Sequence, residues 1–469
     1  MKKKSLQVEP LLLSLAQTIH DAGGRALLVG GWIRDQLRGL PSKDYDVEVF
    51  GLTIAELEKV LQTLGEVISV GRAFGVLRVK GLDIDFSIPR RDSKTGRGHR
   101  GFIVELDPTL DFSTAARRRD LTINSMAYDP LQETILDPYG GMADLDAKQL
   151  RATDPTKFAE DSLRGLRVAQ FCARFEMEPD EQLHVLCSQL DLSDLPGERL
   201  FEELRKMLLK SERPSRGLEF LRTSGLLDIF PELAAMVGVP QDPIWHPEGT
   251  VWEHTLLVVD EAVHLEVGDD SQDLVLLLGA LCHDLGKPAT TVKADGRIRS
   301  PKHDEVGVEL TASFLGRLRA SHELVDQVKA LVRHHLAPTS LTKGGAKARG
   351  YRRLARRLGA SGVDAELLYR VAKADHFGRT TEDALARQFE YGDEFLRRME
   401  ALEVADQAPP DVVQGRHLIA RGYKPSSWFS EVLEVCREVQ DETGWDDPEQ
   451  VLDRALREIN VPPRSEADA

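Results

Sequence analysis

The stretch LVGGWIRDQLRGLPSKDYDVEVFG, residues 28–51, places a strand, a helix and a second strand in immediate succession. Residues 25–31, which end in the paired glycines Gly30 and Gly31, have the apolar content and the terminal turn signal of a strand. Residues 32–39 have helical apolar spacing, and 44–51 have the alternation of a strand. The stretch therefore predicts a compact α/β unit.

The flanking segments extend this unit. An amphipathic helix is expected near the N-terminus, another helix over 53–65, and a hairpin-like pair of strands over 76–90. The Gly-, Arg- and Lys-rich segment 90–102 predicts a mobile basic loop. After about residue 150, apolar residues recur at helical spacing, so we expect helices to dominate the rest of the chain.

Composition restricts the class of protein. The chain has 469 residues and 41% hydrophobic residues, enough for about two to four domains. Its four cysteines lack paired spacing, which argues against a disulfide framework or a zinc ribbon and favours a reducing, intracellular setting. The longest apolar run, 274–282, is far too short to span a bilayer. Because the formal net charge is −16, any surface that binds phosphate must be local.

Two aspartates of the second expected strand are the first candidates for metal binding. Asp44 and Asp46 are two residues apart, so both carboxylates project from one face of the strand and can bind the same hard cations. Asp85, or less favourably Asp83, supplies a third carboxylate from a following strand. Such a set suits two-metal phosphoryl transfer.

The paired glycines add an anion-binding signal. Without side chains, Gly30 and Gly31 let backbone N–H groups approach a triphosphate at the start of a helix, and Arg34 on that helix adds positive charge. A paired glycine or a D-x-D pattern alone is more often an ordinary turn. The two together are far more specific for a nucleotide and metal site.

Histidines concentrate in the second half of the chain. Nine of the thirteen fall within residues 246–376. Neutral imidazoles and carboxylates from separate helices can converge on one divalent ion and lower the pKa of its bound water. A single buried histidine is usually only part of a core, but this ordered set predicts a metal site.

Four segments together resemble a known family. They are residues 28–51, RRRDLTINSMAYDP (117–130), ILDPYGGMADLDAKQLRAT (135–153) and FAEDSLRGLRVAQFCARF (158–175). Their order and spacing are similar to those of the class II tRNA nucleotidyltransferase and poly(A) polymerase family, in particular bacterial CCA-adding enzymes with an HD domain. The resemblance covers nearly the whole chain and is weaker beyond residue 400.

This resemblance implies a fold and a division into domains. The fold is an α+β nucleotidyltransferase head with a small mixed, polymerase-β-like sheet, followed by helical domains. The expected domains are the catalytic head over 1–150, an all-α neck and body over 151–240, an all-α HD domain over 241–400 and a helical tail over 401–469.

The resemblance also implies roles for individual residues. Asp44 and Asp46 would hold Mg²⁺, with Asp85 as the third catalytic carboxylate. Asp120 and Asn124 would recognise the ribose and shape the site. The residues expected to contact the nucleotide are Gly30, Gly31, Arg34, Arg118, Arg119, Asp120, Asn124, Asp161, Arg164 and Arg167.

The segment EDSLR gives a hypothesis for base selection. If it is helical, Asp161 and Arg164 lie at i and i+3 on one face and offer an acceptor beside a fork of donors. Cytosine and adenine each present an exocyclic amino donor beside a ring-nitrogen acceptor, so this pair can select them without a nucleic-acid template. The plain alternative is an intrahelical salt bridge.

Five histidine-bearing segments resemble the HD phosphohydrolase superfamily: WEHTLLVVD, LCHDLGK, KHDEVGVEL, LVRHHLAP and VAKADHFGRT. The matching positions imply that His254, His283, Asp284 and Asp375 bind a divalent transition metal, with Ni, Mn, Co and Fe left open. His303 and His334 would bind a second metal. Relatives with this domain are associated with phosphatase and 2′,3′-cyclic phosphodiesterase activity.

Two further features bear on specificity. Relatives usually carry an arginine at the position of Gln170, which leaves nucleotide preference open. The basic segment 343–357 is able to track a phosphate backbone, although such runs are more often the solvated face of a helix.

The leading hypothesis is therefore transfer of CMP and AMP from CTP and ATP to the 3′ end of tRNA, in the cytoplasm and with no membrane partner. A CC-adding or A-adding member of a split system and a poly(A) polymerase remain alternatives. A regulatory protein-nucleotidylating enzyme and a non-catalytic RNA-binding protein fit less well, because the motifs and the acidic residues are retained. The oligomeric state is left open.

Overall fold

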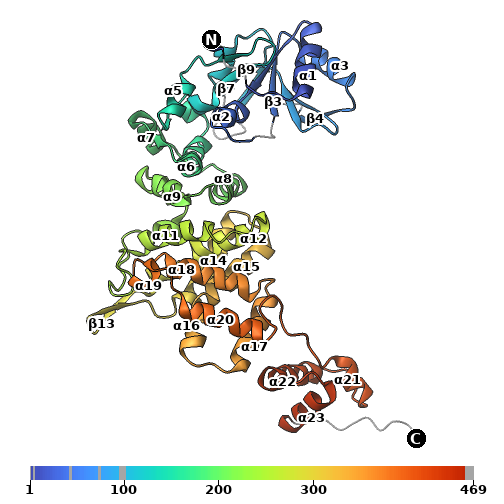
Figure 1. Cartoon of the computed structure of the whole chain (residues 1–469), viewed down its shortest axis with the longest axis vertical. Coiled ribbons are helices and arrows are strands. Elements are labelled where there is room, and N and C mark those ends of the chain that lie inside the picture. Colours follow the sequence, from blue (N-terminus) through green and yellow to red (C-terminus); the bar gives the residue numbers. More distant parts are fainter. Residues whose placement is uncertain (1, 4–5, 42–44, 72–74, 95–101, 460–469) are drawn as a thin grey trace. The chain divides into compact units, whose positions relative to one another are not determined.

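The computed structural model describes residues 2–3, 6–41, 45–71, 75–94 and 102–459. Its contacts divide the chain into two compact units, Met1–Ile229 and Phe230–Ala469 (Figure 1). The finer division into four domains stays a prediction. Among the described residues, no helix is both long and apolar enough to cross a membrane.

A mixed sheet organises the head of the first unit. In the part of the chain that the structure describes, its eight strands follow the order β1-β10-β9-β2-β3-β6-β5-β4. β2 pairs antiparallel with β3, and β3 pairs parallel with β6. The predicted α/β unit and the predicted hairpin, which is β5 and β6, are confirmed. The strands are β1 (Lys2–Lys3), β2 (Arg25–Val29), β3 (Tyr45–Phe50), β4 (Val67–Gly71), β5 (Val76–Val79), β6 (Ile84–Ser87), β9 (Ala127–Asp129) and β10 (Thr134–Leu136).

Three helices accompany this sheet: α1 (Pro10–Asp21), α2 (Gly31–Leu37) and α3 (Ile54–Gln62). Figure 1 shows α1 and α3 beside the strands, and Ile19 of α1 and Leu57 of α3 belong to the same buried core as Val47 of β3. α3 begins with a capping box, in which the side chains of Thr53 and Glu56 each bond the other's backbone N–H. These contacts fix the strand that carries Asp46.

The basic segment 90–102 departs from the expected loop. Its first residues form β7 (Arg90–Lys94), which pairs antiparallel with β8 (Phe102–Leu106). The apolar, β-branched stretch FIVEL favours a strand and gives β7 a partner. The prediction of a loop is therefore wrong for 90–94 and 102, and residues 95–101 lie outside the described residues.

Helices dominate the rest of the first unit, as expected. α6 is central, because it packs against both α8 and α9. Gly217 of α9 allows this approach, since a Cβ there would lie 2.5 Å from the carbonyl oxygen of Ala169 in α6. The elements are α4 (Phe112–Ala116), η2 (Thr122–Asn124), α5 (Gly141–Asp146), β11 (Gln149–Leu150), η3 (Phe158–Glu160), α6 (Leu163–Phe175), β12 (Glu178–Pro179), α7 (Glu181–Ser188), α8 (Gly197–Leu209), α9 (Pro214–Thr223) and η4 (Leu226–Ile229).

Within residues 230–459, the part of the second unit that the structure describes, the fold is helical apart from one hairpin. α11, α12 and α18 pack on one another, and α12 also packs on α15. Its elements are α10 (Pro231–Ala234), α11 (Val251–Val263), α12 (Asp270–Cys282), α13 (Lys287–Thr290), β13 (Val292–Ala294), β14 (Arg297–Arg299), α14 (His303–Arg317), α15 (His322–His334), α16 (Ala337–Lys343), α17 (Ala348–Gly359), α18 (Ala365–Phe377), α19 (Glu382–Leu385), α20 (Glu390–Ala401), α21 (Gly415–Ala420), α22 (Trp428–Thr443) and α23 (Pro448–Glu458).

Some arginines of the basic segment 343–357 make hydrogen bonds and ion pairs to other parts of the chain. In α17, Arg356 Nε donates to Asp441 Oδ1 of α22 at 2.8 Å, and Arg352 Nη1 donates to the Asp441 carbonyl at 3.0 Å. Arg349 lies 3.5 Å from Glu438 of the same helix. These three arginines therefore hold α22 against α17. Only the other basic residues of the segment stay candidates for contact with a phosphate backbone.

Candidate active sites

The turn from β2 to α2 brings the first site together. Gly30 has φ 70° and ψ −130°, a conformation that favours glycine. A Cβ there would lie 3.2 Å from Arg119 Nη1 and 3.3 Å from Asp46 Oδ2. At Gly31 a Cβ would lie 3.3 Å from Arg34 Nη2. The glycines therefore clear space at the point where a carboxylate and two arginines meet.

The expected carboxylates lie in one row of the sheet. Asp46 of β3 and Asp85 of β6 are direct partners in the parallel register, so their side chains share a face. Asp46 is exposed, and Asp85 accepts a hydrogen bond from Arg78 Nε at 2.7 Å. Asp44 lies outside the described residues. The neighbouring Asp83 is largely exposed, 4.0 Å from Arg78.

A buried polar network links α2, η2 and α6. Arg34 donates to Asp35 at 2.9 and 3.0 Å and to Asn124 Oδ1 at 2.6 Å. Asn124 Nδ2 donates to Asp120 Oδ1 at 3.0 Å, and Arg167 Nε donates to Asp120 Oδ2 at 2.7 Å. The structure thus brings together four residues expected from the sequence. Arg34 is 5% exposed, so its donors serve mainly to position Asn124.

The charge on Asp120 is fixed by this network. Burial opposes its ionisation, but the Arg167 guanidinium, the Asn124 amide and the Leu121 N–H together lower the pKa of Asp120 to about 2. Asp120 is therefore an anion at neutral pH. It holds Arg167 and the Asn124 amide, both expected nucleotide contacts, in one fixed arrangement.

Arg118 and Arg119 converge on a single buried carboxylate, Glu48. Glu48 Oε1 accepts a hydrogen bond from Arg118 Nη2 at 3.1 Å, and Oε2 lies 3.6 Å from Arg119 Nη2. Burial lowers the pKa of Arg119, and Glu48 opposes that shift. Because Glu48 is two residues beyond Asp46 on β3, it lies on the same face. It anchors the two arginines beside the carboxylate row.

The geometry of EDSLR differs from the expectation. Helix α6 begins at Leu163, and Asp161 precedes it in an extended conformation, accepting a hydrogen bond from Leu163 N–H at 3.2 Å. Arg164 donates to the carbonyls of Lys157 at 2.8 Å and Arg118 at 2.6 Å. Asp161 instead lies 3.6 Å from Arg199. The prediction of a shared helical face is wrong, because Asp161 bonds the backbone at the start of the helix.

The second site is a cluster of histidines and carboxylates, here called the HD cluster: His254, His283, Asp284, His303, His335 and Asp375. His254 Nε2 lies 3.1 Å from Asp375 Oδ1, and His283 Nε2 lies 3.1 Å from Asp284 Oδ2. His254 Nε2 also lies 4.0 Å from Asp284 Oδ2. α11, the end of α12 and α18 thus bring the four expected core ligands together.

Three imidazoles of the HD cluster are oriented in the same way. His283, His303 and His335 each hold Nδ1 2.7 to 2.8 Å from the backbone carbonyl three residues earlier. A carbonyl only accepts, so each Nδ1 carries a proton, and each ring in its neutral form offers a lone pair at Nε2. His303 Nε2 lies 3.2 Å from His335 Nε2 and 3.5 Å from Asp284 Oδ1. The lone pairs converge, as in histidine metal sites.

These residues fit a divalent cation. His283 Nε2 and both carboxylate oxygens of Asp284 are buried, and none of the three makes a well-aligned hydrogen bond among the described residues. Lys287 Nζ, 2.6 Å from Asp284 Oδ2, supplies one positive charge. Two facing imidazole acceptors and a buried carboxylate are costly unless a cation lies among them. Gly286 permits this packing, since a Cβ there would collide with the His303 carbonyl oxygen.

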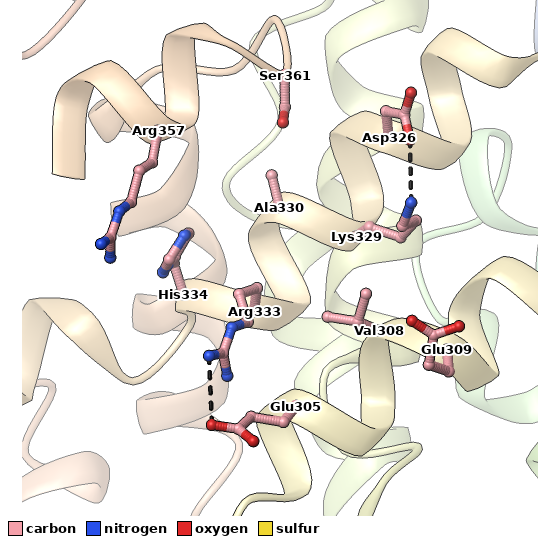
Figure 2. Close-up of a pocket in the computed structure, with 10 residues that line it drawn as sticks. All are labelled: Glu305, Val308, Glu309, Asp326, Lys329, Ala330, Arg333, His334, Arg357 and Ser361. Atoms are coloured by element: carbon pink, nitrogen blue, oxygen red, sulfur yellow. Dashed lines mark hydrogen bonds and ion pairs between the residues drawn. The ribbon is translucent and has the colours of Figure 1, made fainter. Parts of the chain in front are cut away.

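His334, expected at the second metal position, lies elsewhere. It lines a separate cavity of about 490 Å³ with Arg333, Arg357 and Glu305, and Figure 2 shows His334 between the two arginines. Burial lowers the pKa of His334 to about 4, and the arginines add to this shift. Consecutive helical residues point about 100° apart, so His335 and not its neighbour faces the HD cluster.

Family models match most of the chain in three consecutive segments. The poly A polymerase head domain matches residues 26–151, the probable RNA and SrmB-binding site of polymerase A matches 175–237, and the HD domain matches 251–380. The multifunctional CCA protein of Xylella fastidiosa strain 9a5c is 37% identical over 327 residues, which cover 68% of this chain and 76% of the relative.

The chain belongs to the tRNA nucleotidyltransferase and poly(A) polymerase family. The multifunctional CCA protein of Methylobacillus flagellatus is 38% identical over 66% of this chain and 74% of the relative. Among solved structures, the Bacillus stearothermophilus CCA-adding enzyme in complex with CTP aligns with TM-score 0.66 and 18% identity over 96% and 98% of the two chains. The Thermotoga maritima CCA-adding enzyme complexed with tRNA aligns with TM-score 0.60 and 18% identity over 98% and 100%. These structures share the fold.

In this family member, sequence reasoning also missed two acidic residues that shape the sites, Glu48 and Glu248. Glu48 continues the spacing of Asp44 and Asp46, so the pattern D-x-D-x-E held a signal for it. Glu248 Oε1 lies 2.8 Å from Nδ1 of both His246 and His254 and thereby orients His254. No spacing rule pointed to it, because Glu248 lies in the loop before α11.

Proposed function

We propose that the chain adds CMP and AMP to the 3′ end of tRNA, using CTP and ATP and no nucleic-acid template. The observation that carries this proposal is the aligned pair Asp46 and Asp85 beside Gly30 and Arg119, in a chain of this family. In the reaction, the terminal ribose hydroxyl attacks the α-phosphate and pyrophosphate leaves. We also propose a cytoplasmic location, where tRNA matures and the four buried cysteines stay reduced.

The carboxylate donor set fits Mg²⁺, which prefers oxygen ligands. Asp44, Asp46 and Asp85 would hold the ions on one face of the sheet. When bound, Mg²⁺ ions activate the attacking hydroxyl and neutralise charge on the leaving group. Arg118 and Arg119, anchored by Glu48, place positive charge at the edge of the same face.

The network centred on Asp120 would orient the nucleotide. Arg167 and Asn124 are held by the Asp120 carboxylate, so their remaining donors and acceptors have a fixed direction. Asp161, about one third exposed, provides an acceptor at the start of α6 for an exocyclic amino group of cytosine or adenine. Arg164, whose donors go to backbone carbonyls, would position this segment.

The test is extension of tRNA transcripts that end at the discriminator base, at C or at CC. Each is incubated with Mg²⁺ and one triphosphate, or with CTP and ATP together, and the product is read at nucleotide resolution. We expect CC followed by a single A. Arrest at CC, addition of A to CC ends only, or long A tracts would instead assign the chain to a split system or to a poly(A) polymerase.

We propose a second activity, hydrolysis of phosphate esters, at the HD cluster. The convergent Nε2 atoms and the Asp284 carboxylate support it, because this donor set fits a divalent transition metal such as Ni, Mn, Co or Fe. Such an ion, when bound, lowers the pKa of a bound water. Arg379, paired with Asp375 at 3.2 Å, supplies positive charge beside the cluster.

The HD proposal is tested by metal removal. We expect the protein dialysed against a chelator to lose hydrolysis of p-nitrophenyl phosphate and to regain it with one or more of Ni²⁺, Mn²⁺, Co²⁺ and Fe²⁺. If no metal restored hydrolysis, the HD cluster would have no hydrolytic activity and would be a structural remnant. Addition of nucleotides with Mg²⁺ should be unaffected by the treatment.

A further inference from the structure

Two kinds of arginine–carboxylate pair lie on the face of the sheet that carries the carboxylate row. Glu48 is 0% exposed and lies between Arg118 and Arg119. Asp85 pairs with Arg78 of β5, and the two side chains are partly open to solvent, at 35% and 39% exposure. A buried pair is costly to separate, whereas a pair in contact with water is exchanged at little cost.

The strand register places Arg78 at the end of the carboxylate row. Asp85 of β6 has two direct partners, Asp46 of β3 on one side and Arg78 of β5 on the other. The neighbours of Asp85 along β6, Ile84 and Phe86, are buried on the opposite face. Asp85 and its two partners therefore project from the open face. The Arg78 guanidinium thus lies beside the carboxylates proposed to hold Mg²⁺.

Arg78 binds Asp85 through one carboxylate oxygen. Its Nε and Nη2 atoms both lie 2.7 Å from Asp85 Oδ1. An oxygen that accepts two N–H groups has both of its lone pairs engaged, and the guanidinium charge repels a second cation at the same place. In this arrangement Arg78 competes with a metal ion for Asp85.

A second carboxylate lies within reach of Arg78. Arg78 Nη1 lies 4.0 Å from Asp83 Oδ1, and the Asp83 side chain, just before β6, is 79% exposed. On the other side, the register partner of Arg78 in β4 is Ile68, which is 44% exposed and has no polar group. A change of side-chain rotamer therefore lets Arg78 leave Asp85 and pair with Asp83, so that the guanidinium keeps a counter-charge.

We propose that Arg78 is an internal counter-ion that weakens metal binding in the head until a nucleotide is present. Arg78 moves from Asp85 toward Asp83 when metal and a triphosphate bind together, because the triphosphate supplies negative charge and further oxygen ligands. This inference rests on the nucleotide addition proposed above and concerns how that site takes up its metal. Arg78 is thus a positioning residue, which acts through Asp85.

The first test measures metal binding without catalysis. Mn²⁺, which also suits carboxylate ligands, is titrated into the full chain, and the free ion is followed by electron paramagnetic resonance. The binding component lost in Asp46→Asn reports the head and excludes ions bound by the HD cluster. Arg78→Gln should lower the Kd of that component about tenfold, because it removes a positive charge beside the ion. Arg78→Lys, which keeps the charge, should stay near the wild type.

Lys80 provides a matched control. It lies two residues beyond Arg78, its side chain is 66% exposed, and it pairs with Glu66 at 2.8 Å. Lys80→Gln removes the same charge at a greater distance from Asp85 and should change the Kd less than about twofold. An unchanged or higher Kd in Arg78→Gln would overturn the proposal, because loss of an arginine that only orients Asp85 would weaken metal binding.

The second test measures the dependence on nucleotide. Equilibrium dialysis of labelled CTP, without tRNA, gives its Kd with and without Mn²⁺. Metal and nucleotide strengthen each other's binding by the same factor, and in Arg78→Gln this factor should fall about tenfold. A factor equal to that of the wild type would overturn the proposal. If the wild type extends no tRNA, the proposal of nucleotide addition fails, and the Mn²⁺ titration still decides the role of Arg78.

Discussion

The head and the HD cluster both gather charged side chains, but they differ in which groups already have partners. In the head, Arg34, Arg118 and Arg167 are bound to amide or carboxylate oxygens of the chain. In the HD cluster, His283 Nε2 and both Asp284 oxygens are buried without a well-aligned hydrogen bond among the described residues, and His303 Nε2 faces His335 Nε2 at 3.2 Å. The head is therefore a preformed frame around its carboxylate row, whereas the cluster holds buried acceptors whose charge a bound cation would balance.

We expect the largest effect from a substitution in the carboxylate row of Asp46 and Asp85. Asp46→Asn should reduce nucleotide addition about a thousandfold or more, because loss of a metal-binding carboxylate removes several kcal/mol of transition-state stabilisation. Primer extension on tRNA measures the loss. Asp83→Asn, a change at a largely exposed neighbour, is the control and should retain addition. Addition by Asp46→Asn at a rate near that of the wild type would refute the assignment of the site.

The frame itself is tested at Glu48. Its side chain is fully buried between Arg118 and Arg119, so Glu48→Gln should lower the free energy of unfolding by about 3 kcal/mol, by leaving buried guanidinium groups without a counter-charge. Urea unfolding measures this. Glu66→Gln removes an exposed pair with Lys80 and should cost less than about 1 kcal/mol. Equal costs would mean that Glu48 is not the anchor.

The pH dependence of stability distinguishes Asp120. Its pKa is lowered from 3.8 to about 2 in the folded chain, so its stabilising contribution is present above about pH 4 and is lost as pH falls toward 2. The size is about 2 kcal/mol. Asp120→Asn should therefore make the loss of stability between pH 4 and pH 2 shallower than in the wild type. A parallel loss in the two proteins would contradict the Arg167 pairing.

The smallest effect concerns base choice. Asp161→Ala should reduce the preference for CTP and ATP over UTP and GTP about tenfold, which corresponds to about 1.4 kcal/mol, while the first transfer slows less. Single-triphosphate incorporation measures the preference. Asp194→Ala, at an exposed aspartate, is the control. Selectivity that stays sharp in Asp161→Ala would show that other residues choose the base.

For the head, most of the correct predictions came from the spacing of apolar and acidic residues along the strands. The alternation of β3 and the hairpin of β5 and β6 were visible in the sequence, and they bring Asp46 beside Asp85. Glu48 was missed because an acidic residue within a strand gives no sign of being buried. The role of Gln170 was left open, and the structure buries it at 3% exposure, which no spacing rule could specify.

Predictions failed where a difference of one or two residues decides the direction of a side chain. His334 and His335 are neighbours, and only the position at which α15 ends determines which imidazole faces the HD cluster. Asp161 lies two residues before α6, where its carboxylate bonds the backbone instead of sharing a face with Arg164. Such choices depend on hydrogen bonds at helix ends, whose positions sequence patterns place only approximately.

The most direct test of the contrast between the two sites is to measure metal content and nucleotide addition together in Asp284→Ala. If the cluster holds the cation and the head works independently, the purified variant should lose its tightly bound transition metal and its hydrolysis of p-nitrophenyl phosphate. It should still add CCA to tRNA with Mg²⁺ at the wild-type rate. Full metal content in the variant, or a loss of addition in parallel with hydrolysis in a folded protein, would contradict the account.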